Sequence, residues 1–216
     1  MRRFLKEITV SKTEETYSLN HLVPLDPRGL VEKKLGAEGS ETTFTAFATK
    51  EENGFDGYMD AVSTWGSKWG ACEVYVQNVE DSHLFITYES AWSPCSPLIQ
   101  KISQQFPELS FGVYFTEESN AFAGYEVIHN GETVEESTID TQDTPPELRK
   151  KYEKANEAED ESAWEEYWEA ESEWNHYILD RISADCEDVL SQFAKYLATQ
   201  KRRIKQGKEI DEFIPT

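Results

Sequence analysis

The sequence predicts an α+β fold: an antiparallel sheet with helices on one face, followed by an acidic helical extension. Between residues 72 and 134, apolar and polar side chains alternate in short runs separated by turn residues, which is typical of antiparallel strands. After residue 146, apolar side chains recur at intervals of three and four residues, which is typical of amphipathic helices. We therefore expect a sheet domain over residues 1–143 and a helical extension over residues 144–216.

The composition indicates a folded and strongly acidic protein. The chain has 11 Phe, 10 Tyr and 6 Trp residues, too many aromatic side chains for a disordered acidic tail. Its 42 acidic and 21 basic residues give a net charge of -21, so its electric field repels nucleic acid and anionic lipid. We expect a partner with a basic surface and no direct binding to nucleic acid or membranes. The alternative is that the charge only keeps the protein in solution.

Cysteine usage and the N-terminal residues favour the cytoplasm. Cys72, Cys95 and Cys186 are widely separated, odd in number and without a Cys-x-x-Cys pair, so neither a disulfide framework nor a zinc site is indicated. No apolar run approaches the roughly 18 residues of a membrane span. The first seven residues lack the apolar stretch of a signal peptide. We therefore expect a cytoplasmic protein.

Two elements are predicted before residue 64. Asp26 is a suitable N-cap, Pro27 suits the first helical turn and Gly36 can end a helix, so we expect a helix over residues 26–36. Its apolar anchors would be Leu30, Val31 and Leu35. Residues 43–48 alternate as a half-buried strand does.

Clearer signals follow between residues 72 and 134. The alternating runs 72–76 and 84–88 predict a β-hairpin. Ser96 is a suitable N-cap with Pro97 directly behind it, which predicts a helix that ends before Pro107. A strand over residues 109–115 and a hairpin across Asn130-Gly131 complete the predicted sheet, because Asn-Gly is the strongest two-residue hairpin signal.

Two helices are predicted after a polar stretch at residues 138–146. The first begins at Thr144-Pro145-Pro146-Glu147, a capping box with prolines in the first turn. The second begins at the capping box Ser162-Ala163-Trp164-Glu165 and extends to about Gln206. At about 1.5 Å per residue, such a helix would span roughly 65 Å. We expect it to break, to bend back, or to pair with another chain as a homodimer.

Several short motifs resemble those of one protein family. They are Asn20-His21-Leu22-Val23-Pro24, Trp65-Gly66-Ser67-Lys68-Trp69-Gly70-Ala71, the stretch from Thr87 to Pro94, the stretch from Phe106 to Phe111, and Phe122-Ala123-Gly124. In order and spacing they resemble the YubB-type ferredoxin-like domain of phages and plasmids over about residues 18–135, with the C-terminal helices outside it. The resemblance implies a ferredoxin-like sheet and a mobile-element protein in the host cytosol, and it transfers no activity to any residue. Cys95 replaces the second Pro of the family's Ser-Pro-Pro motif, and no Asn-rich strand is evident before residue 18, which leaves the first strand of the sheet open.

The most distinctive segment is the acidic run between residues 153 and 173. Carboxylates one helical turn apart, roughly 5.4 Å, come near the roughly 7 Å between phosphates of one DNA strand. We therefore predict a DNA-mimicking surface with Trp164 and Trp168 as anchors; the alternative is a solvated outer face of a helix that packs on the sheet. The predicted carboxylates are Glu153, Glu157, Glu159, Asp160, Glu161, Glu165, Glu166, Glu169, Glu171 and Glu173.

A second candidate site combines Trp65, Lys68, Trp69 and Trp92. These residues lie just before one predicted strand and just after another, so they can meet at one end of the sheet. Aromatic rings beside a lysine can bind a base, a nucleotide or another small ligand. The alternative is that the rings hold a loop against the core.

Known catalytic patterns are missing from the sequence. There is no Gly-rich phosphate loop, no His-Glu-x-x-His and no Gly-x-Ser-x-Gly, so we expect no catalytic residues and no cofactor, although a thiol nucleophile at Cys95 or Cys186 stays open. Of three Glu-x-x-His spacings only Glu173/His176 is predicted to be helical, and one such pair does not make a metal site. The basic residues 201–205 are expected to complement the helix dipole.

These observations lead to two main hypotheses. The first is a non-enzymatic, acidic, DNA-mimic-like inhibitor from a phage or mobile element, directed at a basic, nucleic-acid-binding host protein such as a defence component. The second is a ferredoxin-like module that binds a small ligand or nucleotide at the Trp65/Trp69/Trp92 end. An enzyme with an unrecognised site is a third alternative.

Overall fold

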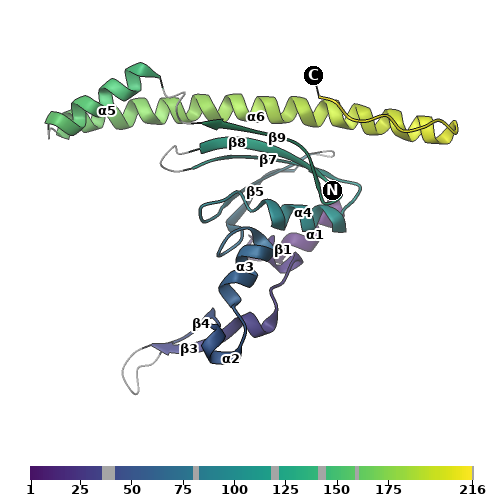
Figure 1. Cartoon of the computed structure of the whole chain (residues 1–216), viewed down its shortest axis with the longest axis horizontal. Coiled ribbons are helices and arrows are strands. Elements are labelled where there is room, and N and C mark those ends of the chain that lie inside the picture. Colours follow the sequence, from purple (N-terminus) through teal and green to yellow (C-terminus); the bar gives the residue numbers. More distant parts are fainter. Residues whose placement is uncertain (36–41, 80–82, 118–121, 141–144, 159–160, 216) are drawn as a thin grey trace. The chain divides into compact units, whose positions relative to one another are not determined.

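The computed structural model describes residues 1–35, 42–79, 83–117, 122–140, 145–158 and 161–215. The chain forms two compact units, Met1–Leu109 and Ser110–Thr216 (Figure 1). Helices and antiparallel strands occur in both, so the predicted α+β class is confirmed. The units divide at a different point of the chain from the domain boundary predicted after residue 143, and that boundary stays a prediction.

The first unit contains short N-terminal elements, a hairpin and a helix. The N-terminal elements are α1 (Arg2–Ile8), β1 (Thr9–Ser11), β2 (Thr16–Tyr17), η1 (Asn20–Leu22), η2 (Pro27–Gly29), β3 (Leu30–Leu35), β4 (Thr42–Phe47), α2 (Lys50–Asn53) and α3 (Gly57–Trp65). They are followed by β5 (Cys72–Val79), β6 (Leu84–Glu89) and α4 (Ser96–Gln105). β5 pairs with β6 antiparallel, and β4 covers most of the strand expected at residues 43–48, so both predictions are confirmed.

The helix predicted over residues 26–36 is wrong for residues 30–35, and its predicted end, Gly36, lies outside the described residues. Asp26 does cap a helical turn, because its carboxylate accepts a hydrogen bond from the backbone amide of Arg28 at 2.9 Å in η2. The chain then extends into β3, which pairs with β4 along its whole length. Leu30 and Leu35 are 41% and 72% exposed, so their spacing forms no buried helical face. Hydrogen bonding to β4 decides the conformation of residues 30–35, and the propensity of the local sequence does not predict this pairing.

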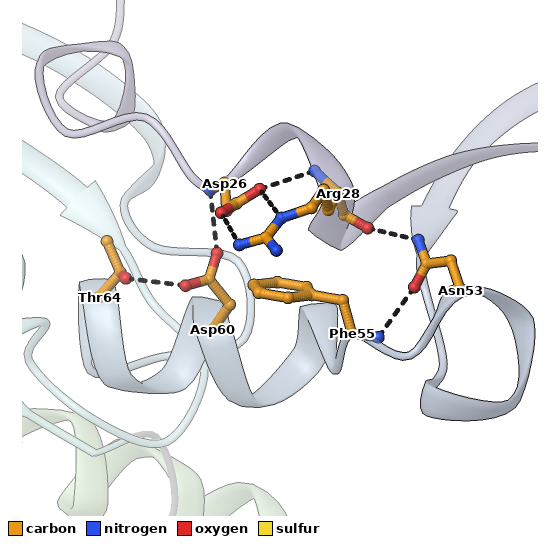
Figure 2. A network of polar contacts seen from close by, with 6 residues as sticks. All are labelled: Asp26, Arg28, Asn53, Phe55, Asp60 and Thr64. Atoms are coloured by element: carbon orange, nitrogen blue, oxygen red, sulfur yellow. Dashed lines mark hydrogen bonds and ion pairs between the residues drawn. The ribbon is translucent and has the colours of Figure 1, made fainter.

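A polar network connects this turn to α2 and α3 (Figure 2). The Arg28 side chain donates to the Asp26 carboxylate at 2.7 and 3.0 Å, which lowers the pKa of Asp26 to about 2. The Asp60 carboxylate accepts from the backbone amide of Asp26 at 3.0 Å, and Asn53 donates to the Arg28 carbonyl at 2.7 Å. The Arg28 guanidinium lies 4.7 Å from the centre of the Phe55 ring. These contacts fix η2 against both helices.

Buried side chains of α1 and α4 contribute to the core of the first unit. Phe4, Ile8, Ile102 and Phe106 are buried, and the rings of Phe4 and Phe106 meet edge to face with centroids 5.0 Å apart. The predicted helix is therefore confirmed as α4, with a correction at its start: Cys95 holds the N-cap position, not Ser96, which is the first helical residue. Pro97 is compatible with either N-cap, because the backbone amides of the first helical turn have no hydrogen-bond partner within the helix.

The second unit contains a three-stranded meander and two helices. Its elements are β7 (Ser110–Thr116), β8 (Phe122–His129), β9 (Glu132–Asp140), α5 (Pro146–Ala158) and α6 (Glu161–Lys205). The strands are antiparallel in the order β7-β8-β9. Asn130 and Gly131 adopt φ angles of 49° and 88°, as a tight hairpin turn requires, so the predicted hairpin is confirmed.

The long helix α6 packs against this sheet (Figure 1). Ile178 and Ile182 pack around Ala123 of β8, and further along the helix Cys186 packs against Val127. A Cβ atom at Gly112 of β7 would lie 2.5 Å from Leu190 and 2.8 Å from Cys186. A residue without a side chain at this point therefore permits the close approach of helix and sheet.

The helix α6 is continuous over 45 residues and begins at Glu161, one residue before the predicted capping box. It neither breaks nor bends back; α5 lies along its N-terminal part instead (Figure 1). Residues 208–215 return along its C-terminal part, where Arg203 pairs with Asp211 at 2.9 Å and the Phe193 and Phe213 rings lie 5.0 Å apart. Neighbouring segments thus cover both ends of a helix about 68 Å long. Across the described residues, the helices contain no uncharged apolar stretch of the length that a membrane span requires.

Candidate functional site

The acidic run predicted from the sequence lies on α5 and on the N-terminal part of α6. Its exposed members in the structure are Glu153, Glu157, Glu161, Glu165, Glu166, Glu169 and Glu173. Glu171 is half-buried and accepts a hydrogen bond from the Tyr167 hydroxyl. Glu159 and Asp160, which belong to the same prediction, lie outside the described residues. The described carboxylates therefore face solvent, with the one exception at Glu171.

Four of these carboxylates form an acidic ridge along one side of α6. Glu161, Glu165, Glu169 and Glu173 follow one another at four-residue intervals, so neighbours are about 6 Å apart along the helix axis. Glu169 lies nine residues, about two and a half turns, before the buried Ile178, and it therefore points away from the sheet. The ridge concentrates negative charge on the solvent side of the helix.

Four aromatic residues pack together beside the acidic ridge; we call them the hairpin cluster. The rings of Trp164 and Trp168 are stacked, with centroids 6.0 Å apart and planes at 27°. Tyr152 of α5 meets Trp164 and Tyr167 of α6 at 6.0 and 5.3 Å, edge to face. Trp168 is 57% exposed and Tyr152 46%. The hairpin cluster thus stabilises the α5–α6 contact and still presents an indole to solvent.

Polar contacts support the same arrangement. Lys154 of α5 pairs with Glu166 of α6 at 3.0 Å across the hairpin. Burial raises the pKa of Tyr167, and the neighbouring Glu171 raises it further, so this hydroxyl stays protonated and donates to the carboxylate. Tyr167 and Tyr152 were not among the predicted site residues. Tyr167 follows Trp164 by three residues, so helical spacing could have placed it in the hairpin cluster. Tyr152 belongs to the hairpin cluster only because α5 pairs with α6.

The structure brings three of the four residues of the second candidate site together. Trp69 and Trp92 are stacked, with centroids 6.4 Å apart and planes at 28°, and they are 51% and 72% exposed. The Lys68 ammonium lies 4.6 Å from the centre of the Trp69 ring. Trp65 is engaged separately, because its indole N–H donates to the Val23 carbonyl at 2.7 Å. Three of the four predicted residues therefore form a platform, and Trp65 fixes its own chain segment to the core.

Neighbouring loops hold this platform in place. The Asn20 amide donates to the Trp69 carbonyl and accepts from the Ala71 amide, both at 2.9 Å. Gly70 between them adopts a φ of 66°, and a Cβ atom there would lie 2.3 Å from the Asn20 side chain. Trp92 itself has a φ of 62°, a left-handed conformation that costs energy for a residue with a bulky side chain. The two indoles are thus aimed by a well-tethered backbone.

The thiols left open as nucleophiles are not activated. Burial raises the pKa of Cys95 to about 11 and that of Cys186 to about 12. Both thiols are therefore protonated at neutral pH, and a thiolate is the form that attacks. The helical pair Glu173/His176 does not converge with other ligands, and the His176 ring nitrogen lies 2.7 Å from the Ser172 carbonyl. Among the residues that the structure describes, no group of three or more His, Cys, Asp and Glu side chains could hold a metal ion.

Comparison with protein families assigns part of the chain. Residues 71–163 match the model of a family described as the ferredoxin-like domain in Api92-like protein. The match covers less than half of the 216 residues, from the last residue before β5 to the first turn of α6. The predicted ferredoxin-like resemblance is confirmed in part: the match begins at residue 71 instead of about 18, and it includes α5, which was expected to lie outside. None of the curated proteins and none of the solved structures compared matches the chain.

Proposed function

We propose that this protein is a non-enzymatic binding protein of a phage or mobile element that acts in the host cytosol. Its acidic ridge and hairpin cluster would occupy the nucleic-acid-binding surface of a basic host protein, as a DNA mimic does, and inhibit it. The observation that carries this proposal is the Trp164–Trp168 stack, in which Trp168 is exposed, beside a row of carboxylates on one side of α6. The motif resemblance to phage and plasmid proteins supports the context.

Aromatic rings and carboxylates contribute in different ways to such a surface. Tryptophan and tyrosine are enriched among the few residues that supply most of the binding free energy of an interface. Trp168 and Tyr152 are exposed enough to be covered by a partner, and their neighbours hold them in one orientation. Carboxylates around them accelerate association with a basic surface and exclude acidic partners. The combination therefore favours one tight and charge-selective contact.

The spacing of the acidic ridge suits a surface that binds phosphates. Its four carboxylates extend over about 18 Å at steps of about 6 Å, close to the roughly 7 Å between phosphates along one DNA strand. Lysine and arginine side chains that contact consecutive phosphates are long enough to absorb the remaining difference. A nucleic-acid-binding protein can thus meet the ridge with the same basic residues.

The cost of the acidic ridge also supports a binding role. Like charges four residues apart destabilise a helix by a few tenths of a kcal/mol per pair. Three such pairs follow one another between Glu161 and Glu173, and none of these four carboxylates is neutralised by a basic side chain in the described ion pairs. The packing of Ile178 and Ile182 on the sheet offsets this cost. A basic partner would remove it.

The direct test is capture of a host partner with a charge-reversed ridge. Glu165, Glu169 and Glu173 are changed to Lys in the full chain, and the control changes Glu7, Glu14 and Glu51 to Lys, which are exposed carboxylates of the first unit. Both variants have the same net charge, so they differ only in where the negative charge is lost. Each is immobilised and exposed to host lysate at about 50 mM and about 1 M salt.

The proposal predicts a basic protein that the unaltered chain and the control retain at low salt, that the ridge variant loses, and that elutes at high salt. Both variants should keep the thermal midpoint of the unaltered chain, because all six carboxylates are exposed. Equal capture by the two variants, or retention of the same protein at high salt, would contradict the proposal.

A second candidate function uses the platform of Lys68, Trp69 and Trp92. It is favoured by the exposed indole stack and by the ammonium group over the Trp69 ring, an arrangement that can bind an aromatic anion such as a nucleotide. Titration with nucleoside triphosphates while recording tryptophan fluorescence tests it. Saturable quenching that Trp92→Ala abolishes would support this function, and unchanged fluorescence up to millimolar ligand would exclude it.

A further inference from the structure

The helix α6 changes the sign of its charge along its length. Residues 161–188 contain ten acidic side chains and one basic side chain, whereas residues 189–208 contain six basic side chains and no acidic one. The helix dipole accounts only for the two ends, because its effect falls off within the first and last turn. Asp188 and Lys195 lie near the middle of the helix, far from both ends. A partner that contacts α6 along its length would account for this charge asymmetry.

An exposed ridge follows the side of α6 that faces away from the sheet. Glu187 and Ser191 lie nine residues, about two and a half turns, after the buried Ile178 and Ile182, so they point in the opposite direction. The ridge advances in alternating steps of three and four residues, as in the seam between two paired helices. We call it the outer ridge; its members, all exposed, are Tyr177, Asp180, Ala184, Glu187, Ser191, Ala194, Ala198, Lys201 and Lys205.

We infer that the outer ridge is the contact between two copies of this chain, whose α6 helices pair antiparallel about Ser191. In this register Asp180 of one copy lies opposite Lys201 of the other, and the two-fold axis repeats the contact. A parallel pair would set Lys201 against Lys201 and Lys205 against Lys205, which is repulsive. The charges of the ridge are therefore complementary to a second copy of the same ridge in one direction only.

The remaining side chains of the outer ridge fit this pairing. Tyr177, 55% exposed, lies opposite Lys205 of the second copy, where its ring can receive the ammonium group. Asp188 and Lys195 flank the seam on the same side and form a further pair of opposite charges. Arg181 of one copy would lie near Arg202 of the other at the edge of the seam. Both side chains are exposed and can turn to solvent. The short side chains in the middle of the ridge allow the two helices to approach closely.

The dimer leaves the proposed binding surface free. The helix of the second copy ends opposite Tyr177, so it does not reach the acidic ridge or the hairpin cluster. Antiparallel pairing places one such surface at each end of the assembly, and a partner with two basic sites would gain affinity from both. The dimer does not rest on the proposed function, since its contacts use other residues.

A charge exchange tests the pairing. Sedimentation velocity of the full chain at low salt should show a dimer that Asp180→Lys or Lys201→Glu weakens about tenfold, because each change turns two attractive contacts into repulsive ones. The double variant Asp180→Lys/Lys201→Glu should return the dissociation constant to within about threefold of the original. Lys150→Glu on α5, an exposed lysine outside the outer ridge, is the matched control and should leave the dimer unchanged.

Cysteine cross-linking then tests the direction. In a Cys72→Ser background, Ala184→Cys and Ala198→Cys chains are mixed and oxidised; Cys95 and Cys186 are buried and stay unreactive. Antiparallel pairing predicts a disulfide between one chain of each kind and little within either kind alone. Three results would overturn the inference: a chain that stays monomeric up to about 100 μM, a dimer whose dissociation constant Lys201→Glu does not change, and a disulfide between two Ala198→Cys chains.

Discussion

Two stacked tryptophan pairs in this protein have nearly the same geometry and opposite surroundings. Trp69 and Trp92 lie 6.4 Å apart with planes at 28°, and Trp164 and Trp168 lie 6.0 Å apart with planes at 27°. The first pair has the Lys68 ammonium over one ring. The second is bordered by the acidic ridge. A similar arrangement of two indoles is therefore found in two different electrostatic settings.

The support behind each pair differs as well. The first pair is held by loops, through the Asn20 amide and the tight turn at Gly70. The second is held by a helix that packs on a sheet along much of its length. The acidic excess also differs, with 16 acidic and 10 basic residues in 1–109 against 26 and 11 in 110–216. Stacked rings thus supply apolar contact area, and the surrounding charge selects which partner can cover it.

The largest expected effect concerns the thiols buried in the two units. With pKa values of about 11 for Cys95 and about 12 for Cys186, less than about 1% of either is thiolate at pH 8. Both should therefore react at least a hundredfold more slowly with a disulfide reagent than an ordinary thiol of pKa about 8.5. Counting the thiols that react in native and in urea-unfolded protein checks this. Rapid reaction of Cys95 or Cys186 in addition to Cys72 in the native protein would show that one of the two cores is open.

The same pKa values predict a pH dependence of stability. Between about pH 9 and pH 11, the unfolded chain releases the protons of Cys95 and Cys186 while the folded protein keeps them. The free energy of unfolding should therefore be highest below pH 9 and fall as the pH rises through this window. Urea unfolding at several pH values measures it. A stability that rises between pH 9 and pH 11 would contradict the burial of both thiols.

The next effect separates the helix-supported pair from the loop-supported one. Ile182→Ala removes a side chain that packs against Ala123 of the sheet, and it should lower the free energy of unfolding by about 3 kcal/mol. Ser172→Ala, at an exposed position of the same helix outside the outer ridge, is the control and should change it by less than about 0.5 kcal/mol. A loss below about 1 kcal/mol in a urea titration of Ile182→Ala would mean that α6 is not held by this core.

A smaller effect is expected at the support of the first pair. Asn20→Ala removes the hydrogen bonds to the Trp69 carbonyl and the Ala71 amide, and it should cost about 2 kcal/mol of stability. Lys12→Ala, an exposed change in the same unit, should cost less than about 0.5 kcal/mol. If Asn20→Ala is as harmless as its control, the Trp69 loop is held by other contacts.

The smallest effect tests the electrostatic contrast itself. Cations collect near an acidic surface. The ratio of quenching by caesium to quenching by iodide should therefore be about twice as large for Trp168 as for Trp92. Quenching curves of Trp168→Phe and Trp92→Phe identify the two contributions by difference. Equal preference of both indoles for the two ions would remove the distinction between the surroundings of the pairs.

Periodicity predicted the elements that depend on local pattern. The β5–β6 and β8–β9 hairpins, α4 and the helical region after residue 146 were all indicated by alternation, capping residues or the Asn130-Gly131 turn. The error at residues 30–35 arose because the apolar residues of β3 are spaced as in a helix, while a strand twelve residues later supplies its hydrogen bonds. No local pattern contains that information.

The charges of the candidate surface were predictable from the sequence, and the packing of its aromatic rings was less so. The acidic run and its spacing of about one helical turn were evident in the sequence, and in α6 the four-residue intervals put Glu161, Glu165, Glu169 and Glu173 on one side of the helix. The contact of Tyr152 with Trp164 depends on how α5 lies along α6, which the sequence does not specify. The close approach at Gly112 is likewise a property of the packed sheet and helix.

The proposed function is tested most directly by competition with DNA. The host protein captured by the unaltered chain is bound to a fluorescent DNA duplex, and the chain is then added while anisotropy is recorded. Stoichiometric release of DNA by the unaltered chain, with little release by the Glu165→Lys/Glu169→Lys/Glu173→Lys variant or by Trp168→Ala, is the expected result. A ternary complex of host protein, DNA and this chain would contradict the account.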